Sequence, residues 1–316
     1  MNILFMGTPD FATASLAALL SAGKHVCAVV TQPDKARGRG MKVTFSDVKK
    51  YALEKGLPVL QPETLKNGAF LPALEEYKPD LIAVVAYGKI LPEYILNFPK
   101  YGCVNVHGSL LPKYRGAAPI QRAVLNGDTV SGVTTMRLDK GMDTGDMYFS
   151  ESVEIGENTT TGELFDTLAE IGGKLLVKTV DALENGSAVL TAQDHAVATH
   201  ADKITPEECL VDFSLPAREV HNRIRGLSPF PGAFSYLNGK TVKLYDSRLN
   251  DEKEQSAPFG TVLEASRDGI MIACGTGSVR LLSFKPEGKG LLSAADMVNG
   301  RKITAGMRFE TGKADE

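Results

Sequence analysis

The sequence lacks a long hydrophobic run. No stretch of about 18 consecutive apolar residues occurs, which excludes a protein built around membrane-spanning helices. The amino terminus, Met1 to Phe5, also lacks the basic region of a secretory signal and reads as the start of a strand. We therefore expect a cytoplasmic protein with no membrane partner.

Cysteine is scarce, and the four cysteines are widely separated at positions 27, 103, 209 and 274. Their spacing favours reduced, buried thiols over a disulfide framework. No pair of cysteines or histidines has the spacing of metal ligands. His195 and His200 lie in a polar segment and are expected to be solvated. The sequence therefore predicts no metal site.

An excess of basic residues is absent too. The net charge is −3, which excludes a uniformly basic nucleic-acid binder. The charge is unevenly distributed, because acidic residues predominate up to residue 208 and basic residues slightly predominate after it. The carboxy-terminal part could face an anionic partner, and a neutral structural role explains the same asymmetry equally well.

The chain is long enough for two domains, with 316 residues and 43% hydrophobic content. Its first half alternates short apolar runs with helical periodicity, which is typical of repeated β-α-β units. The apolar runs lie at 3–6, 26–30, 58–60, 81–86 and 103–107. We predict a Rossmann-like α/β domain over residues 1–190, with an open, twisted and mostly parallel sheet.

The second half has a different pattern. A long helix is predicted from Thr161 to Glu184, after a Thr160 or Thr161 cap, and the polar residues 191–208 read as a linker. Five short strands at 234–237, 241–245, 260–264, 270–273 and 279–284 then predict a small β-barrel, OB-like in type, over residues 209–316.

Asn105 and His107 lie two residues apart at the end of a predicted strand. Their side chains therefore share one face, at the edge of the sheet where α/β enzymes place their sites. An amide and a protonated imidazole can together donate hydrogen bonds to the oxygen of a tetrahedral intermediate, as attack of an amine on a formyl carbon would produce. The alternative is a pair of satisfied core polar groups.

Asp143 lies in the turn Gly141-Met142-Asp143-Thr144-Gly145. The flanking glycines would allow the carboxylate to fold back towards His107, where it could orient the imidazole and accept a proton from the amine. Turn formation alone also explains an aspartate next to glycine. The spacing leaves both interpretations open.

Two loops suggest ligands. Gly7-Thr8-Pro9-Asp10 follows the first strand, but it lacks the dinucleotide pattern because Pro9 replaces the second glycine, so a tight turn with an Asp10 helix cap is preferred. The segment from Asp34 to Lys42 places four cations among glycines, as a phosphate-binding loop would. An ordinary solvated loop is the alternative.

These motifs together resemble the methionyl-tRNA formyltransferase family over nearly the whole chain. The resemblance is carried by Gly7-Thr8-Pro9-Asp10-Phe11-Ala12, Asn105-Val106-His107-Gly108-Ser109-Leu110-Leu111-Pro112, Tyr114-Arg115-Gly116-Ala117-Ala118-Pro119-Ile120-Gln121 and Asp143-Thr144-Gly145-Asp146. The pattern from Asn105 to Asp143 is shared by the wider group that uses 10-formyltetrahydrofolate. The acceptor is indicated by the basic loop and the carboxy-terminal domain.

The resemblance implies a role for each motif. Its implied catalytic residues are Asn105, His107 and Asp143; its folate-contacting residues are Tyr87, Ile90, Ser109, Leu110, Leu111 and Pro112; its tRNA-contacting residues are Lys35, Arg37, Arg39 and Lys42, with Arg39 the most critical. Arg37 and Met41 depart from the family's residue order in the basic loop.

The resemblance thus implies formyl transfer from 10-formyltetrahydrofolate to the α-amine of initiator methionyl-tRNA, by a metal-free monomer. Two alternatives are an N-formyltransferase acting on an amino sugar or another small amine, and a non-catalytic tRNA-binding protein.

Overall fold

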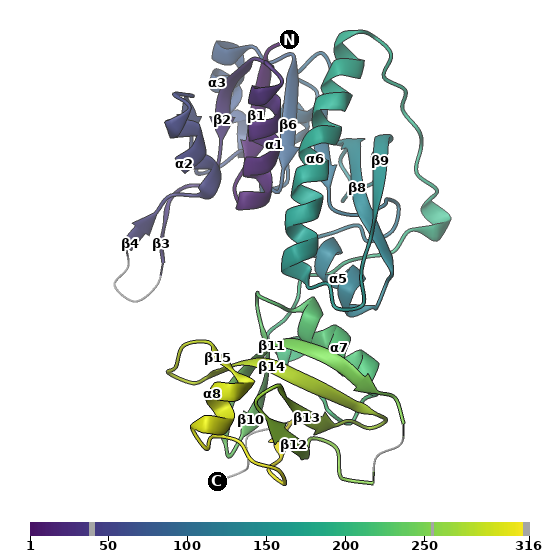
Figure 1. The fold of residues 1–316 in the computed structure, drawn as a ribbon. Coiled ribbons are helices and arrows are strands. Elements are labelled where there is room, and N and C mark those ends of the chain that lie inside the picture. The colour runs from purple at the N-terminus through teal and green to yellow at the C-terminus, as the bar shows by residue number, and fades with distance from the viewer. Residues whose placement is uncertain (38–41, 254–255, 312–316) are drawn as a thin grey trace. The chain divides into compact units, whose positions relative to one another are not determined.

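A computed structural model describes residues 1–37, 42–253 and 256–311 (Figure 1). The chain forms two compact units. The first unit contains Met1–Gly116, Ser131–Val153 and Phe165–Ala201, and the second contains Ala117–Val130, Glu154–Leu164 and Asp202–Glu316. The chain therefore passes between the units several times, whereas the sequence analysis expected a single crossing near residues 191–208.

The short segment 154–164 belongs to the second unit, although the sequence predicts it within the first domain. The Thr161 hydroxyl donates a hydrogen bond of 2.7 Å to the Gly226 carbonyl, and Arg225 donates to the carbonyls of Gly156 and Thr159. These partners lie about 65 residues further along the chain. Periodicity in the sequence reports only neighbouring residues, so it could not assign this segment to the second unit.

The first unit is built on a mostly parallel sheet of seven strands in the order β5-β2-β1-β6-β7-β8-β9 (Figure 1). The strands are β1 Ile3–Gly7, β2 Val26–Val30, β5 Val59–Leu60, β6 Leu81–Val85, β7 Cys103–His107, β8 Val130–Arg137 and β9 Met147–Glu154. β8 is antiparallel to β7, and the strand pairs from β5 to β7 are parallel. The predicted open α/β sheet is confirmed.

Helices cover both faces of this sheet, which explains why its central strands are continuous apolar runs. They are α1 Asp10–Ser21, α2 Asp47–Glu54, α3 Leu71–Tyr77, α4 Glu93–Leu96 and α6 Thr161–Glu184. On one face, Leu4, Met6, Ile82 and Val84 form a core with Leu74 and Ile95 of α3 and α4. On the other, α6 approaches so closely that a Cβ on Gly172 would lie 2.8 Å from Val106.

The start of α1 differs from the prediction. Asp10 is the first residue of the helix, the N-cap is Pro9, and no side chain caps this end. The interpretation of Asp10 as a cap is therefore wrong. Gly7 is required for another reason, since a Cβ there would lie 2.6 Å from the Cβ of Ala12. The predicted cap of α6 is present at Thr160, whose hydroxyl accepts from the Glu163 N–H.

The basic segment is partly a hairpin. β3 Lys35–Arg37 pairs antiparallel with β4 Lys42–Thr44, whereas the sequence suggested only a loop. Near the start of this hairpin, the Lys49 ammonium and the Gln61 amide both bind the Asp34 carboxylate. The segment is thus anchored at its start to α2 and to Gln61.

The second unit contains an antiparallel sheet in the order β12-β13-β14-β11-β10-β16, with β15 beside β14. Its strands are β10 Ala233–Leu237, β11 Lys240–Asp251, β12 Val262–Ser266, β13 Gly269–Ala273, β14 Ser278–Pro286, β15 Leu292–Ser293 and β16 Phe309–Glu310. The N–H of Val262 donates to Met307 and that of Phe309 to Gly260, so the two edges of the sheet meet and close a small barrel.

Three helices belong wholly to the second unit: α5 Pro119–Leu125, α7 Ala217–Gly226 and α8 Ala294–Asn299. α7 contributes Ala217, Val220 and Ile224 to the barrel core. No helix in residues 1–37, 42–253 and 256–311 is long and apolar enough to cross a membrane.

Candidate active site

The end of β7 directs Asn105 and His107 towards the α3 and α4 side of the sheet. Cys103, two residues before Asn105, is buried in the core with these helices. Because alternate residues of a strand share a face, Asn105 and His107 point the same way from its carboxyl end. His107 is 6% exposed and Asn105 is partly buried. Their common face, expected from spacing, is present in the structure.

The imidazole of His107 is held through its Nε2 atom. This atom lies 2.9 Å from the carbonyl oxygen of Tyr114. A carbonyl can only accept, so Nε2 carries the hydrogen, an assignment that follows from the hydrogen-bond geometry. Nδ1 is not part of this hydrogen bond, and it carries a second N–H when the ring is protonated.

Asp143 comes from the loop between β8 and β9. Its Oδ2 atom lies 3.6 Å from Nδ1 of His107 and accepts a hydrogen bond of 2.8 Å from the N–H of Gly116. The residue has a φ of 54°, in the left-handed region that residues other than glycine adopt infrequently. The fold thus brings the carboxylate to the imidazole across 36 positions of sequence.

The Asn105 amide makes no hydrogen bond within the described part of the chain. An amide without a hydrogen bond, an imidazole and a carboxylate 3.6 Å from its Nδ1 atom therefore occur together at one edge of the sheet. Such a set can donate hydrogen bonds to a developing oxyanion and accept a proton from a nucleophile. The interpretation of Asn105 as a satisfied core residue does not fit its free amide.

The loop after β7 is fixed against β8. The Thr134 hydroxyl donates to the Ser109 carbonyl at 2.7 Å and lies 3.2 Å from the N–H of Leu111, for which it can act as acceptor. Leu110 packs against Gly132, where any Cβ would lie 2.5 Å from the leucine side chain. Ser109 and Leu111 are buried, and Pro112 is partly exposed. These four predicted folate contacts therefore form one ordered loop beside His107.

The other two predicted folate contacts have opposite environments. The side chain of Tyr87 is 1% exposed and belongs to the core, where burial raises the pKa of its phenol to about 12. Ile90 is 85% exposed. The Tyr87 carbonyl already accepts hydrogen bonds from Gln32 and Thr8. The apolar side chain of Ile90 is therefore open to solvent, whereas that of Tyr87 is enclosed.

The predicted tRNA contacts lie in the β3–β4 hairpin. Lys35 and Arg37 are in β3, and Lys42 is in β4. Arg39 lies outside the described residues. The backbone register pairs Arg37 of β3 with Lys42 of β4.

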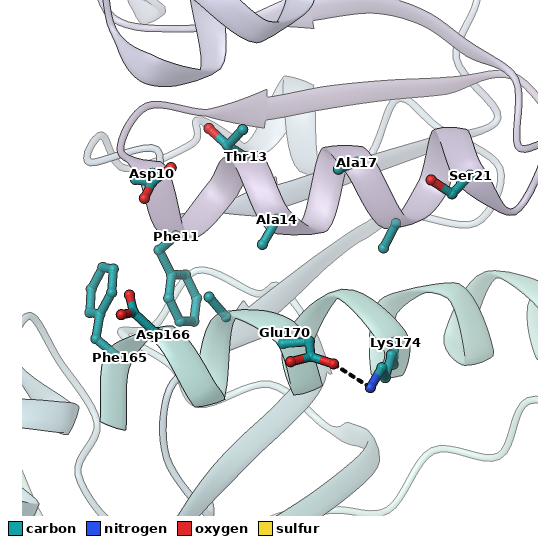
Figure 2. Close-up of a pocket in the computed structure, with 12 residues that line it drawn as sticks. Asp10, Phe11, Thr13, Ala14, Ala17, Ser21, Phe165, Asp166, Glu170 and Lys174 are labelled. Carbon is teal, nitrogen blue, oxygen red and sulfur yellow. Dashed lines mark hydrogen bonds and ion pairs between the residues drawn. The ribbon is translucent and has the colours of Figure 1, made fainter. Parts of the chain in front are cut away.

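A hollow of about 470 Å³ opens between α1 and α6, away from these residues (Figure 2). It is lined by Asp10, Phe11, Thr13, Ala14, Ala17, Ala18, Ser21, Phe165, Asp166, Ala169, Glu170 and Lys174. Figure 2 shows Phe11 beside Phe165, with ring centres 5.0 Å apart, and a hydrogen bond from Lys174 to Glu170. None of its lining residues belongs to the site at the end of β7.

Sequence reasoning missed two residues next to the site. Gln193 and Arg115 are 4% and 5% exposed, and the Gln193 side chain binds both Arg115 and the Asp143 loop. The resemblance implies no role for Arg115, and Gln193 lies in the predicted linker 191–208. The residues around Gln193 give no indication that it is buried, because its hydrogen-bond partners are 78 and 50 residues away in the sequence.

Comparison with known proteins identifies the family. The family model described as "Formyl transferase" matches residues 1–180. The model described as "Formyl transferase, C-terminal domain" matches residues 203–302. A methionyl-tRNA formyltransferase of Desulfotalea psychrophila is 48% identical over 305 residues, covering 96% of this chain and 94% of the relative. The chain belongs to the methionyl-tRNA formyltransferase family.

Other comparisons agree with this family. A second member, from Desulforamulus reducens, is 44% identical over 317 residues and covers both chains completely. Among solved structures, a sugar 3N-formyl transferase has a TM-score of 0.66 at 21% identity, over 92% of this chain and 99% of the other. That likeness shows a shared fold. Membership of the family makes the chain a transferase enzyme, which excludes the alternative of a non-catalytic tRNA-binding protein.

Proposed function

We propose that this enzyme transfers the formyl group of 10-formyltetrahydrofolate to the α-amine of methionyl-tRNA. The proposal rests on one observation above all, the approach of Asp143 Oδ2 to within 3.6 Å of His107 Nδ1 in a chain of this family. The products are N-formylmethionyl-tRNA, which serves translation initiation, and tetrahydrofolate.

The first step is attack of the amine nitrogen on the formyl carbon. A bond forms between these atoms, and the electron pair of the carbonyl moves to oxygen. The Asn105 amide and the Nδ1–H of protonated His107 donate to that oxygen, and such preorganised donors contribute roughly 100- to 1000-fold each. The hydrogen bond from Nε2 to Tyr114 holds the ring in this orientation.

The second step breaks the bond between the formyl carbon and N10 of the folate. The electron pair on the oxygen re-forms the carbonyl as this bond breaks, and N10 takes up the proton that the amine nitrogen has lost. Asp143 accepts that proton from the amine, directly or through a water molecule. The hydrogen bond from the Gly116 N–H keeps the Asp143 carboxylate at the site. From there the carboxylate also stabilises the imidazolium of His107.

The choice of donor has its own support. A folate-type formyl donor is indicated by the similar sugar 3N-formyl transferase, which was solved in the presence of 5-N-formyl-THF. We assign the folate to the loop Ser109–Pro112 and to the exposed Ile90, which can contact a flat ring. Tyr87 would contribute through its backbone, because its side chain is enclosed.

The choice of acceptor rests on the relatives and the basic hairpin. The relatives at 48% and 44% identity are methionyl-tRNA formyltransferases, matched over 94% and 100% of their own length. Lys35, Arg37, Arg39 and Lys42 would contact the tRNA phosphates, as would the barrel unit. Phosphate contacts of this type position a nucleic acid without reading its sequence.

The test is formyl transfer by the purified protein in parallel reactions. Each contains 10-formyltetrahydrofolate and one acceptor: methionyl initiator tRNA, methionyl elongator tRNA or a nucleotide-linked amino sugar. The proposal expects formylmethionine on the initiator tRNA, with little product on the others. Formylation of the amino sugar alone would establish the small-amine alternative instead.

Two further expectations accompany this function. A cytoplasmic location follows from the role in translation initiation, and activity as a monomer is a prediction that light scattering on the purified protein can check. No group of three or more His, Cys, Asp or Glu residues in the described segments could hold a metal ion. A metal-free reaction also remains a prediction, and activity after dialysis against a chelator tests it.

A further inference from the structure

The loop that carries Asp143 needs support from outside itself. The left-handed backbone of Asp143 is costly for a residue with a side chain, and such conformations persist only where surrounding contacts impose them. Within the loop, the Asp139 carboxylate accepts from the Gly141 N–H and the Thr144 hydroxyl. These bonds shape the turn without fixing it relative to His107.

Gln193 supplies a connection from outside the loop. Its Nε2 atom donates to the carbonyls of Asp143 at 2.9 Å and Gly145 at 2.7 Å, one on each side of Thr144. Both hydrogens of the amide are therefore used on this loop. Its Oε1 atom accepts from Nε and Nη2 of Arg115, at 3.1 and 2.7 Å. The orientation of this buried amide is fully determined by its partners.

Arg115 lies in the middle of the tripeptide that touches both catalytic groups. The residue before it, Tyr114, accepts from His107, and the residue after it, Gly116, donates to Asp143. The backbone of Arg115 is itself paired, since its N–H donates to Thr199 and its carbonyl accepts from Ala201. Residues 193–201 therefore hold the tripeptide and the Asp143 loop at once.

We propose that Gln193 is a positioning residue, which sets the distance between the Asp143 carboxylate and the His107 imidazole through Arg115 and the loop carbonyls. This inference rests on the proposed function of the same site. The segment containing Gln193, which by sequence is a polar linker, would then be a structural part of the active site.

The decisive variant is Gln193→Glu. The replacement has the same shape and can still accept from Arg115, so the fold is retained. The second carboxylate oxygen would face the carbonyls of Asp143 and Gly145, which repel it, and the loop would move. A displacement of about 1 Å at a catalytic group can cost on the order of 100-fold. We expect kcat to fall by about that factor, with KM for both substrates nearly unchanged.

A double-mutant cycle separates positioning from a general structural role. If Gln193 acts through Asp143, adding Gln193→Glu to Asp143→Ala should lower kcat by less than about twofold, because coupled residues are not additive. Full additivity in this cycle, or wild-type kcat in Gln193→Glu, would overturn the proposal. Glu170→Gln, which makes the reverse exchange on the exposed face of α6, is the matched control and should leave kcat unchanged.

Two additional measurements cover other outcomes. If Gln193→Glu does not fold, Thr199→Val removes the hydroxyl that accepts from the Tyr114 N–H at 2.8 Å, and it should lower kcat in the same way. A second measurement does not depend on the acceptor. The ¹⁵N resonances of the His107 ring report whether the Asp143 carboxylate lies next to it, even if methionyl-tRNA is not the acceptor. They should shift in Gln193→Glu as they do in Asp143→Asn, and unchanged resonances would refute the positioning role.

Discussion

Replacement of Asp143 by asparagine tests the central pair of the site. The amide keeps an oxygen that can accept from the Gly116 N–H, and asparagine tolerates a left-handed backbone better than most residues. The fold should therefore persist, while the negative charge next to His107 is lost. Because the two side chains are 6% and 15% exposed, solvent screens this charge only partly.

The size of the effect follows from the distance. Two unit charges 3.6 Å apart interact by about 4 to 5 kcal/mol at an effective dielectric constant of about 20. If half of this stabilises the protonated imidazole in the transition state, the rate falls about 50-fold, and if all of it does, on the order of 2000-fold. We expect single-turnover formylation of charged tRNA to slow within this range.

The control is Asp143→Ala, which removes the charge and the acceptor of the Gly116 N–H together. Its melting temperature should be lower than that of Asp143→Asn, because a buried donor loses its partner and alanine is strained at this φ. Formylation by Asp143→Asn within about threefold of the wild-type rate would refute the electrostatic role of the carboxylate.

Three other changes test separate parts of the molecule. Arg39→Ala should weaken binding of charged tRNA and flatten its dependence on salt concentration without affecting folate binding; equal salt slopes would contradict a phosphate contact. Tyr87→Phe removes a buried hydroxyl that has no hydrogen-bond partner among the described residues, so calorimetry should give an unchanged free energy of unfolding or a gain of up to about 1 kcal/mol, and a clear loss would contradict this. Finally, the hydrogen bond from Arg122 lowers the pKa of Glu208, and the resulting stabilisation is present above the ordinary glutamate pKa and disappears as pH falls through the lowered one. The melting-temperature advantage of the wild type over Glu208→Gln should therefore be largest near neutral pH and shrink as the solution is acidified below the ordinary glutamate pKa, whereas a constant difference would exclude this linkage.

Much of the first unit is predictable because its pattern is local. The strands Val26–Val30 and Cys103–His107 and the helix Thr161–Glu184 coincide with the predicted ranges. Strands buried on both faces and long amphipathic helices have distinct periods. The β3–β4 hairpin was missed, because a short basic strand has no apolar pattern.

The sequence alone also determined part of the site. Asn105 and His107 share a face through the two-residue period of a strand, which requires no knowledge of the rest of the chain. Motifs of adjacent residues carried the resemblance to the family, and the relatives confirm that resemblance.

Only the tertiary structure decided where Asp143 lies. The turn that contains it predicts a bend but not what the bend faces, and the contact with His107 depends on the pairing of β7 with β8. The same holds for Gln193, which is hydrophilic in sequence and buried in the fold because all its polar atoms find partners there. Local periodicity reports which side of an element a residue occupies, whereas long-range hydrogen bonds decide which residues meet.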